Sequence, residues 1–328
     1  MDTHLAPLRP RRHTTSAPTG RHLSVDRCVD LMASRYQWAE TTRSNAHHYL
    51  GQGRFLAFCS ARGITCVTDL TNEAILDFMA DMRDAVKVSR NTLRRYRNYF
   101  RRLADFCADT PGFENPNFTA SAVPKAPKAP RGRRPDALTA TEEAALVAAV
   151  EGQRRDSLLI RLMLACGLRV SEVSALCVDD VTVTARPPRV LITKGHSDIT
   201  KSGLDRQVTF RQPYTADLTK DLEAWVEKYR PKSRYPHLFL SERRALGAPM
   251  TTGGVRQMLE RAAAKAGLRS VHPHLLRRTW ATRLADAGAS VTDLMQQAGW
   301  SSIEMVTVYY AGAEESALVR VAGLRVEG

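Results

Sequence analysis

The sequence predicts a mainly α-helical chain with one small antiparallel β-sheet, divided into a helical N-terminal domain and an α+β C-terminal domain. Apolar residues recur at helical spacing over residues 25–109 and again beyond residue 136, and only two short segments have a β-strand composition. A proline-rich basic segment separates the two regions. The length of 328 residues suffices for two ordinary domains, and 43% hydrophobic with 25% charged residues is the balance of a globular protein.

The charge of the chain points to a polyanionic partner. A formal net charge of +14 is hard to explain by solubility alone, because self-repulsion of this size is usually tolerated when a polyanion neutralises it. We rank nucleic acid ahead of an anionic membrane, since no run approaches the roughly 18 apolar residues of a membrane span and the start lacks the apolar core of a secretory signal. The six cysteines form no C-x-x-C pair and are interpreted as reduced core residues. A cytoplasmic, nucleoid-associated protein is expected.

Residues 1–22 predict a flexible basic arm. They carry four arginines against the single acid Asp2, together with prolines that block helix formation. A mitochondrial transit peptide is the alternative. Residues 23–118 then form the helical domain, in which Gly63 is expected to end one helix and Thr71 to cap the next.

One helix of this domain is expected to have two distinct faces. Ser89 can cap it, and Leu93, Tyr96, Phe100 and Leu103 recur at helical spacing. Four arginines recur on another face: Arg90, Arg94, Arg97 and Arg101. We therefore expect one side to pack and the other to bind DNA phosphates, the alternative being an ordinary solvated helix face.

Residues 119–135 predict an extended cationic linker. The prolines of this segment make it unsuitable for a helix, and its basic residues make it unsuitable for a core. The basic residues are Lys125, Lys128, Arg131, Arg133 and Arg134. Such a linker suits two domains that close around a DNA duplex, although a plain spacer is the alternative.

The rest of the chain, residues 136–328, is expected to form the second domain with a C-terminal tail. One helix begins near Thr141, and another runs over residues 157–166 and is followed by a glycine. Residues 189–193 and 207–210 are rich in β-formers and flank a glycine-containing turn, which predicts a small antiparallel sheet.

The segment Gly167 to Glu172, with the sequence G-L-R-V-S-E, carries the first candidate catalytic residue. Arg169 follows a helix end and precedes a helix that Ser171 is expected to cap. Phosphodiester exchange adds negative charge to the non-bridging oxygens, and a fixed guanidinium suits that geometry. A helix-helix turn with a surface arginine is the alternative for this segment taken alone.

The segment His272 to Trp280, with the sequence H-P-H-L-L-R-R-T-W, carries the second candidate cluster. His274 and Arg277 share a helix face once that helix begins, so they would converge on one phosphate. A metal site is the alternative for two histidines, but no further ligand stands at the required spacing.

A third cluster runs from Gly299 to Tyr310 and ends in two tyrosines. A lone tyrosine is usually a packing residue. The order of the three clusters, however, resembles the tyrosine recombinase (phage integrase) family: G-L-R-x-S-E, then H-x-L-R-[H/R]-T, then G-[H/W]-x-S about ten residues before a tyrosine. The resemblance covers residues 134–313 with motifs, and the helical domain more loosely resembles the core-binding domain of that family.

The resemblance implies a role for each matching residue. Arg169 and Arg277 would bind the non-bridging oxygens, and His274 would assist proton transfer. Trp300 would donate its indole N–H to the phosphate and pack its ring beneath it. The spacing from Trp300 selects Tyr309 over Tyr310 as the nucleophile.

Three further positions bear on this assignment. The family uses a lysine in a β-hairpin as general acid, and the K-S-G-L-D-R-Q-V segment favours Lys201, while Lys194 remains the alternative. Arg278 stands where many members have histidine, which adds positive charge. Glu172 is expected to orient its neighbours, because a carboxylate facing the phosphate would oppose the developing charge.

The implied reaction forms a 3′-phosphotyrosine on double-stranded DNA and needs neither a cofactor nor a metal, for DNA integration, excision or resolution. The resemblance further implies a homotetramer on paired sites, and an accessory DNA-bending or directionality factor is a further candidate partner. The tail after Tyr309 is expected to dock into a neighbouring subunit or to pack on its own domain.

Two other classes of protein compete with this interpretation. A DNA-binding regulator is the first, because residues 291–310 are compatible with a helix-turn-helix motif with Gly299 in the turn. That interpretation leaves Arg169 and the spacing from His274 to Arg277 unexplained. A type IB topoisomerase is the second, since it uses similar chemistry without pairing two sites.

Overall fold

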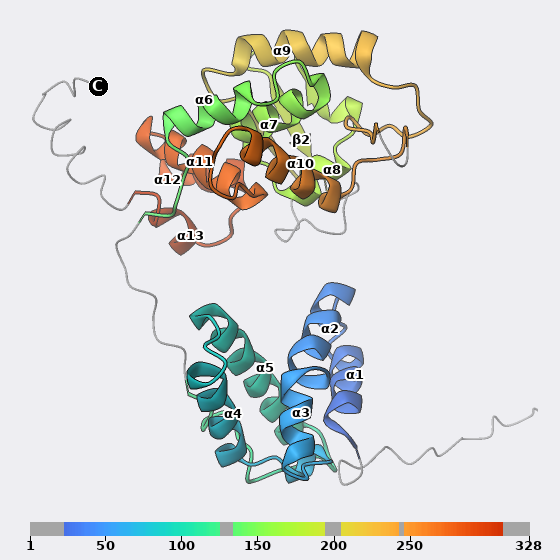
Figure 1. Ribbon diagram of the computed structural model, residues 1–328, viewed down its shortest axis with the longest axis vertical. Helices are drawn as coiled ribbons and strands as arrows, with labels where there is room; N and C mark the ends of the chain where they lie inside the picture. The colour runs from blue at the N-terminus through green and yellow to red at the C-terminus, as the bar shows by residue number, and fades with distance from the viewer. Residues whose placement is uncertain (1–22, 125–133, 194–204, 243–245, 311–328) are drawn as a thin grey trace, which may run out of the picture. The chain divides into compact units, whose positions relative to one another are not determined.

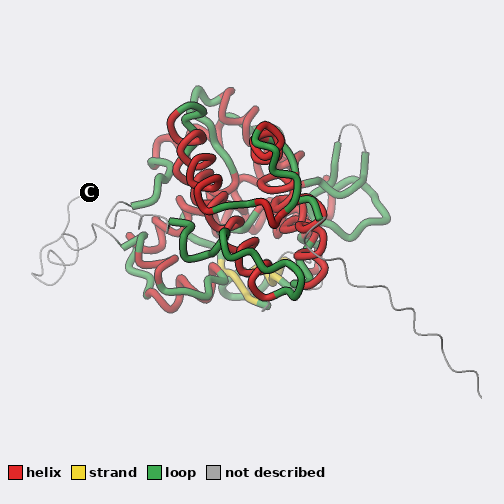
Figure 2. The backbone as a smooth tube through the Cα atoms, turned by 90° about the horizontal axis from the view of Figure 1, so that it is seen from below, coloured by secondary structure: helices red, strands yellow, loops and turns green. Residues whose placement is uncertain are grey.

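The computed structural model describes residues 23–124, 134–193, 205–242 and 246–310, and the chain divides into two compact units, Met1–Ala129 and Pro130–Gly328. Helices make up most of the described chain, with a few short strands in the second unit, so the predicted fold class is confirmed (Figure 1, Figure 2). Each unit has its own hydrophobic core. In these ranges no helix is both long and apolar enough to cross a membrane.

The first unit is a bundle of helices around an aromatic core. Its helical elements are α1 (Val25–Arg35), α2 (Glu40–Ala46), the π-helical turn η2 (His47–Gly51), α3 (Arg54–Ala61), the 3-10 turn η3 (Val67–Asp69), α4 (Asn72–Asp84) and α5 (Arg90–Asp109). The ring centroids of Phe55 and Phe100 lie 4.8 Å apart, and Phe78 packs edge-on against Phe55 at 5.1 Å. Thr71 caps α4 through the Ala74 N–H, as the sequence predicts.

Helix α5 has the two faces expected from its sequence. The Ser89 hydroxyl accepts the Thr92 N–H at its start, and the predicted apolar positions are buried. The side chains of Arg90 and Arg94 are exposed, whereas those of Arg97 and Arg101 are half-buried. Within the described residues none of these four arginines forms an ion pair, so their charge is not neutralised by a neighbour there.

The helical unit extends further than residue 118. The Thr119 N–H donates to Asn72 Oδ1 over 2.9 Å, and Val123 is buried in the core of the first unit. The first six residues of the predicted linker therefore pack on the helical unit. Four of the basic residues predicted there, Lys125, Lys128, Arg131 and Arg133, lie outside the described residues.

The second unit combines helices with one small sheet. Its helical elements are α6 (Ala140–Ala148), α7 (Arg154–Cys166), α8 (Val170–Ala175), η4 (Val178–Asp180), α9 (Thr215–Ala224), η6 (Trp225–Tyr229), α10 (Thr252–Lys265), α11 (Pro273–Asp286), α12 (Val291–Ala298) and α13 (Glu304–Thr307). Helix α6 begins at Ala140, next to Thr141 as expected, and Thr139 caps it, because Glu142 reaches back to the Thr139 N–H and completes a capping box.

The sheet has three antiparallel strands in the order β1-β2-β3. The two predicted strands are β2 (Arg189–Ile192) and β3 (Arg206–Thr209), which pair with Val190 opposite Val208. A third strand, β1 (Val181–Thr182), was not predicted from the sequence, because two residues are too short to show an alternating pattern.

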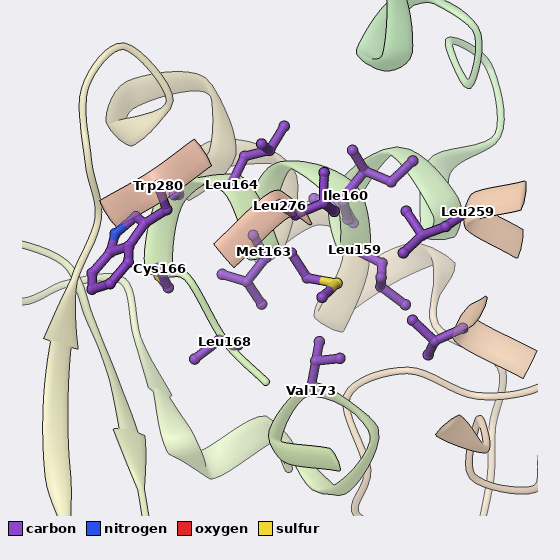
Figure 3. Packing of buried hydrophobic residues seen from close by; sticks show 14 of the residues in the cluster. Leu159, Ile160, Met163, Leu164, Cys166, Leu168, Val173, Leu259, Leu276 and Trp280 are labelled. Atoms are coloured by element: carbon purple, nitrogen blue, oxygen red, sulfur yellow. The ribbon is translucent and has the colours of Figure 1, made fainter. Parts of the chain in front are cut away.

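Helix α7 forms the centre of the second core. Its side chains are buried on nearly every side, and they face Leu276 of α11, Leu259 of α10 and Val173 of α8 (Figure 3). Gly167 ends α7 in the left-handed conformation with φ 59°, and a Cβ atom added there would lie 2.2 Å from the Trp280 ring. The turn that leads to Arg169 therefore requires glycine for both conformation and space.

Gly167→Ala is expected to reduce the free energy of unfolding of the second unit by about 2–4 kcal/mol, because it combines a strained φ with overpacking against Trp280. Urea denaturation measures this loss. Gly267→Ala is the matched control, since Gly267 also has a positive φ but no atom within 4 Å of an added Cβ. Equal losses in the two variants would show that contact with Trp280 contributes nothing.

Candidate active site

Arg169 is held in place by its own helix terminus. It is the N-cap of α8, and Ser171 lies inside the helix, so the predicted serine cap is wrong. The carboxylate of Glu172, three residues on, reaches back and accepts both the Arg169 N–H over 2.8 Å and the guanidinium Nη1 over 2.7 Å. Nη2 donates to the Gly299 carbonyl over 3.2 Å, which connects α8 to the end of α12.

Glu172 joins two arginines beneath this turn. The carboxylate oxygen Oε2, which accepts the Arg169 N–H, also accepts Nη2 of Arg206 over 2.8 Å, and the whole residue is 3% exposed. Burial alone would raise the pKa of Glu172, but the hydrogen bond and charge of Arg206 and the charge of Arg277 lower it to about 2. Glu172 is therefore ionised at neutral pH, and it orients cations rather than facing a substrate.

Arg277 is the most buried cation of the cluster. It is 4% exposed on α11, where Nη1 donates to the Gly167 carbonyl over 2.6 Å and Nη2 donates to the Ala298 carbonyl. Burial and the charge of Arg169 lower the pKa of Arg277 to about 9, so the guanidinium remains protonated at neutral pH. Arg169 and Arg277 thus both bridge the turn after α7 and the end of α12.

His274 lies in the first turn of α11. Pro273 opens this helix, and the His272 ring, as N-cap, accepts the Leu275 N–H over 3.2 Å. Burial, followed by the charge of Arg277, lowers the pKa of His274 below its ordinary value. A neutral imidazole at neutral pH can accept a proton, which suits a general base beside two arginines.

Tyr309 stacks on Trp300. The ring centroids lie 5.3 Å apart with an interplanar angle of 12°, and Tyr309 is 6% exposed. The guanidinium carbon of Arg277 lies 5.1 Å from the centroid of the Trp300 ring. Burial raises the pKa of Tyr309, while the charges of Arg277 and Arg278 act in the opposite direction. The predicted nucleophile Tyr309 therefore lies next to Trp300, and Trp300 lies next to Arg277.

Tyr310 occupies a different environment from Tyr309. Its hydroxyl donates to the Ala289 carbonyl over 2.6 Å, in the loop between α11 and α12.

The helix-turn-helix interpretation is not favoured by this region, because α13 has only four residues after the turn at Gly299. Such a short helix provides little surface for a DNA groove.

The structure brings together Arg169, His274, Arg277, Trp300 and Tyr309 in the second unit. The other predicted catalytic and DNA-binding residues are not part of this cluster. Lys201 and Lys194 lie outside the described residues, as does the tail from residue 311. The four arginines of α5 belong to the first unit. Over the described ranges, no group of three potential metal ligands comes together.

Arg206 is a residue whose role the sequence did not reveal. It is 7% exposed, and besides Glu172 it binds the Gln297 carbonyl through Nε over 2.9 Å. A Cβ atom on Gly299 would lie 3.1 Å from its Cδ. Arg206 and Val208 are two residues apart and both lie on the buried face of β3. The sequence signal for Arg206 was therefore an arginine at a strand position where a buried residue is expected.

The order and convergence of these residues agree with a comparison of the whole sequence. Residues 136–316, more than half of the chain, match the model of the phage integrase family. The chain belongs to this family. Its members are the tyrosine recombinases, which are DNA strand-transfer enzymes.

Two similar proteins are tyrosine recombinases of the Xer type. XerA of Thermococcus kodakarensis is 30% identical over 245 residues, which cover 74% of this chain and 77% of that protein. XerD of Corynebacterium glutamicum is 26% identical over 271 residues, which cover 78% of this chain and 83% of that protein. The similarity therefore extends beyond the motifs of the second unit.

Solved structures of integrases share the fold of this tyrosine recombinase. A XerH recombinase bound to a palindromic difH substrate has a TM-score of 0.68 and 17% identity, over 91% of this chain and 84% of that one. The Tn1549 transposon integrase in complex with transposon right end DNA has a TM-score of 0.65 and 20% identity, over 92% of this chain and 100% of that one.

Proposed function

We propose that this tyrosine recombinase cleaves and rejoins DNA at a specific site with Tyr309 as the nucleophile. The phenol oxygen forms a bond to the scissile phosphorus, and the bond from phosphorus to the 5′ oxygen breaks. The products are a 3′-phosphotyrosine and a free 5′ hydroxyl. Attack by a second 5′ hydroxyl reverses the step on a new partner, and because one phosphoester replaces another, no ATP is consumed. The observation that carries this proposal is the stacking of Tyr309 on Trp300 beside Arg277.

The pocket supplies charge and proton transfer in fixed positions. Arg169 and Arg277 are already oriented by Glu172 and by main-chain carbonyls, so their donors need little reorganisation when a phosphate arrives. The buried phenol of Tyr309 needs a base to lose its proton, and His274 takes this role as a neutral imidazole. Trp300 donates an N–H but cannot carry a proton.

The substrate is double-stranded DNA, which the net charge of +14 favours. In the first unit, Arg90 and Arg94 present exposed guanidinium groups along α5 and are the arginines best placed for phosphate contacts. We extend the proposal to a homotetramer on paired sites, with an accessory DNA-bending or directionality factor as a further partner. The reaction would take place at the nucleoid.

The experiment that tests the proposal is covalent trapping on DNA. A preferred site is first selected by binding from a pool of random duplexes, and a nick beside the scissile phosphate then prevents religation. We expect a covalent complex whose digestion yields a phosphorylated peptide containing Tyr309. Specific DNA binding without any covalent adduct would favour the interpretation as a DNA-binding regulator. Relaxation of supercoiled DNA by a monomer would favour a type IB topoisomerase.

Lys201→Ala is expected to lower the cleavage rate by about 10²–10⁴-fold, because a general acid contributes a factor of that size. A 5′-bridging phosphorothiolate has a leaving group that needs no proton, so it should restore the rate of this variant. Lys194→Ala is the matched control and should show no such rescue. Rescue confined to Lys194→Ala would transfer the general acid role to Lys194.

A further inference from the structure

The side chain of Arg134 has two hydrogen-bond partners within the second unit. Its Nε donates to the main-chain carbonyl of Tyr309 over 3.0 Å, and its Nη2 donates to Asp286 Oδ1 over 2.6 Å. These two nitrogens lie on one edge of the planar guanidinium, which therefore bridges the two acceptors. The sequence places Arg134 in the basic linker expected to lie along DNA, but this edge of its guanidinium is engaged within the protein.

The Tyr309 carbonyl lies just beyond a helix end. The short helix α13 ends at Thr307, and the Tyr309 N–H donates back to the Val306 carbonyl over 2.9 Å. The main chain at Tyr309 is thus in a tight turn directly after α13, and Arg134 donates to a carbonyl that has no helical partner there. Arg134 consequently fixes the backbone from which the phenol extends.

Asp286 connects this contact to the helix that bears the other catalytic groups. It is the last residue of α11, the helix of His274 and Arg277. A carboxylate at a helix C-terminus is unfavourable because the dipole is negative there, and the guanidinium of Arg134 offsets both charges. Arg134 therefore links the nucleophile segment to α11 through one planar group.

We propose that Arg134 is a positioning residue for the nucleophile and not a phosphate contact. This inference rests on the proposed function, in which Tyr309 attacks DNA. Arg134 sets the distance between the Tyr309 main chain and the helix that carries Arg277, so that the phenol reaches the phosphorus held by the two arginines. Since a displacement of about 1 Å in a reacting group can cost about 100-fold in rate, the loss of this bridge should act on catalysis rather than on DNA affinity.

The test separates cleavage from binding. Arg134→Ala and Arg134→Lys are compared with the wild type in single-turnover cleavage at saturating DNA, using the nicked site of the trapping experiment, and DNA affinity is measured at several salt concentrations. We expect both variants to cleave about 10–100-fold more slowly, because a lysine ammonium cannot bridge the two acceptors as a planar fork does. The dissociation constant and its salt dependence should stay unchanged.

Arg269→Ala is the matched control for the loss of an exposed arginine ion pair in the same unit. Arg269 pairs with Asp136 and donates to the Ala137 carbonyl over 3.2 Å. It therefore holds the chain just after Arg134, and no contact between Arg269 and Tyr309 is seen among the described residues. The cleavage rate of Arg269→Ala should remain within about twofold of the wild type, as expected for a surface pair.

A phosphorothiolate substrate should not rescue Arg134→Ala, since placement of the nucleophile matters for any leaving group.

Two results would overturn the inference. In the first, Arg134→Ala binds DNA more weakly with a salt slope reduced by about one, and Arg134→Lys restores normal binding and cleavage, which is the behaviour of a phosphate contact. In the second, both variants cleave at the wild-type rate. Either result, obtained while the wild type still forms an adduct at Tyr309, leaves the proposed function intact. An absent wild-type adduct would instead contradict the proposed function itself.

Discussion

Tyr309→Phe is expected to abolish covalent attachment to DNA, whereas Tyr310→Phe should keep it. Tyr309 stacks on Trp300 beside Arg277, and removal of its hydroxyl removes the attacking atom. The hydroxyl of Tyr310 donates to the Ala289 carbonyl, so its loss should cost about 1 kcal/mol of stability, the usual value of one hydrogen bond. Gel electrophoresis of the nicked substrate under denaturing conditions measures the adduct.

The two tyrosine variants serve as controls for each other. Both lose one hydroxyl from adjacent residues, so a general effect on folding would appear in both. DNA affinity should be unchanged in Tyr309→Phe, which shows that the protein is folded. Loss of the adduct only in Tyr310→Phe would reject the assignment of the nucleophile.

Glu172→Gln is expected to reduce the free energy of unfolding of the second unit by about 3–5 kcal/mol, because it leaves buried arginines without a counter-charge. Arg206 is the most affected, since its side chain is 5% exposed and binds the carboxylate directly. Cleavage should also fall, because Arg169 loses the group that orients it. Urea denaturation measures the first effect, and single-turnover cleavage measures the second.

Glu142→Gln is the control for this substitution. Glu142 occupies the same third position of its helix and makes the same contact to the N-cap N–H, but it lies on a partly exposed surface. Its loss should cost about 1 kcal/mol or less. Similar losses in the two variants would show that the buried arginines place no special demand on Glu172.

The contribution of Glu172 should depend on pH in a defined direction. Its pKa is lowered from 4.5 to about 2 in the folded protein, so its stabilising effect is fully present above about pH 4.5 and is lost as the pH falls towards 2. This difference in pKa corresponds to about 3 kcal/mol. The difference in the free energy of unfolding between the wild type and Glu172→Gln should therefore be constant from pH 5 to 7 and should shrink below that range, by at most about 1.4 kcal/mol per pH unit.

The helices and their caps were largely predictable because their signals are local. Ser89 and Thr71 precede apolar periodic segments, and each accepts a main-chain N–H three residues on. The start of α8 was misassigned because Arg169 and Ser171 both stand near it. Glu172 decides in favour of Arg169, since its carboxylate reaches the N–H three residues back.

The supporting roles of Arg206 and Arg134 could not be predicted, because their partners are distant in sequence. Arg206 binds a carboxylate 34 residues earlier, and Arg134 binds a carbonyl 175 residues later. Nothing in the local pattern of a basic, proline-rich segment distinguishes an arginine that contacts DNA from one that holds the backbone of Tyr309. Only the folded chain reveals which groups meet.

In the part of the chain that the structure describes, the two hydrophobic cores share no residue. A substitution in the aromatic core of the first unit therefore subtracts stability from that unit without loosening the packing around α7. Natural variation can exchange one surface for another on the helical unit while the pocket around Tyr309 keeps its geometry. Under the proposed function, new DNA target preferences could therefore evolve in the first unit while the pocket around Tyr309 stays the same.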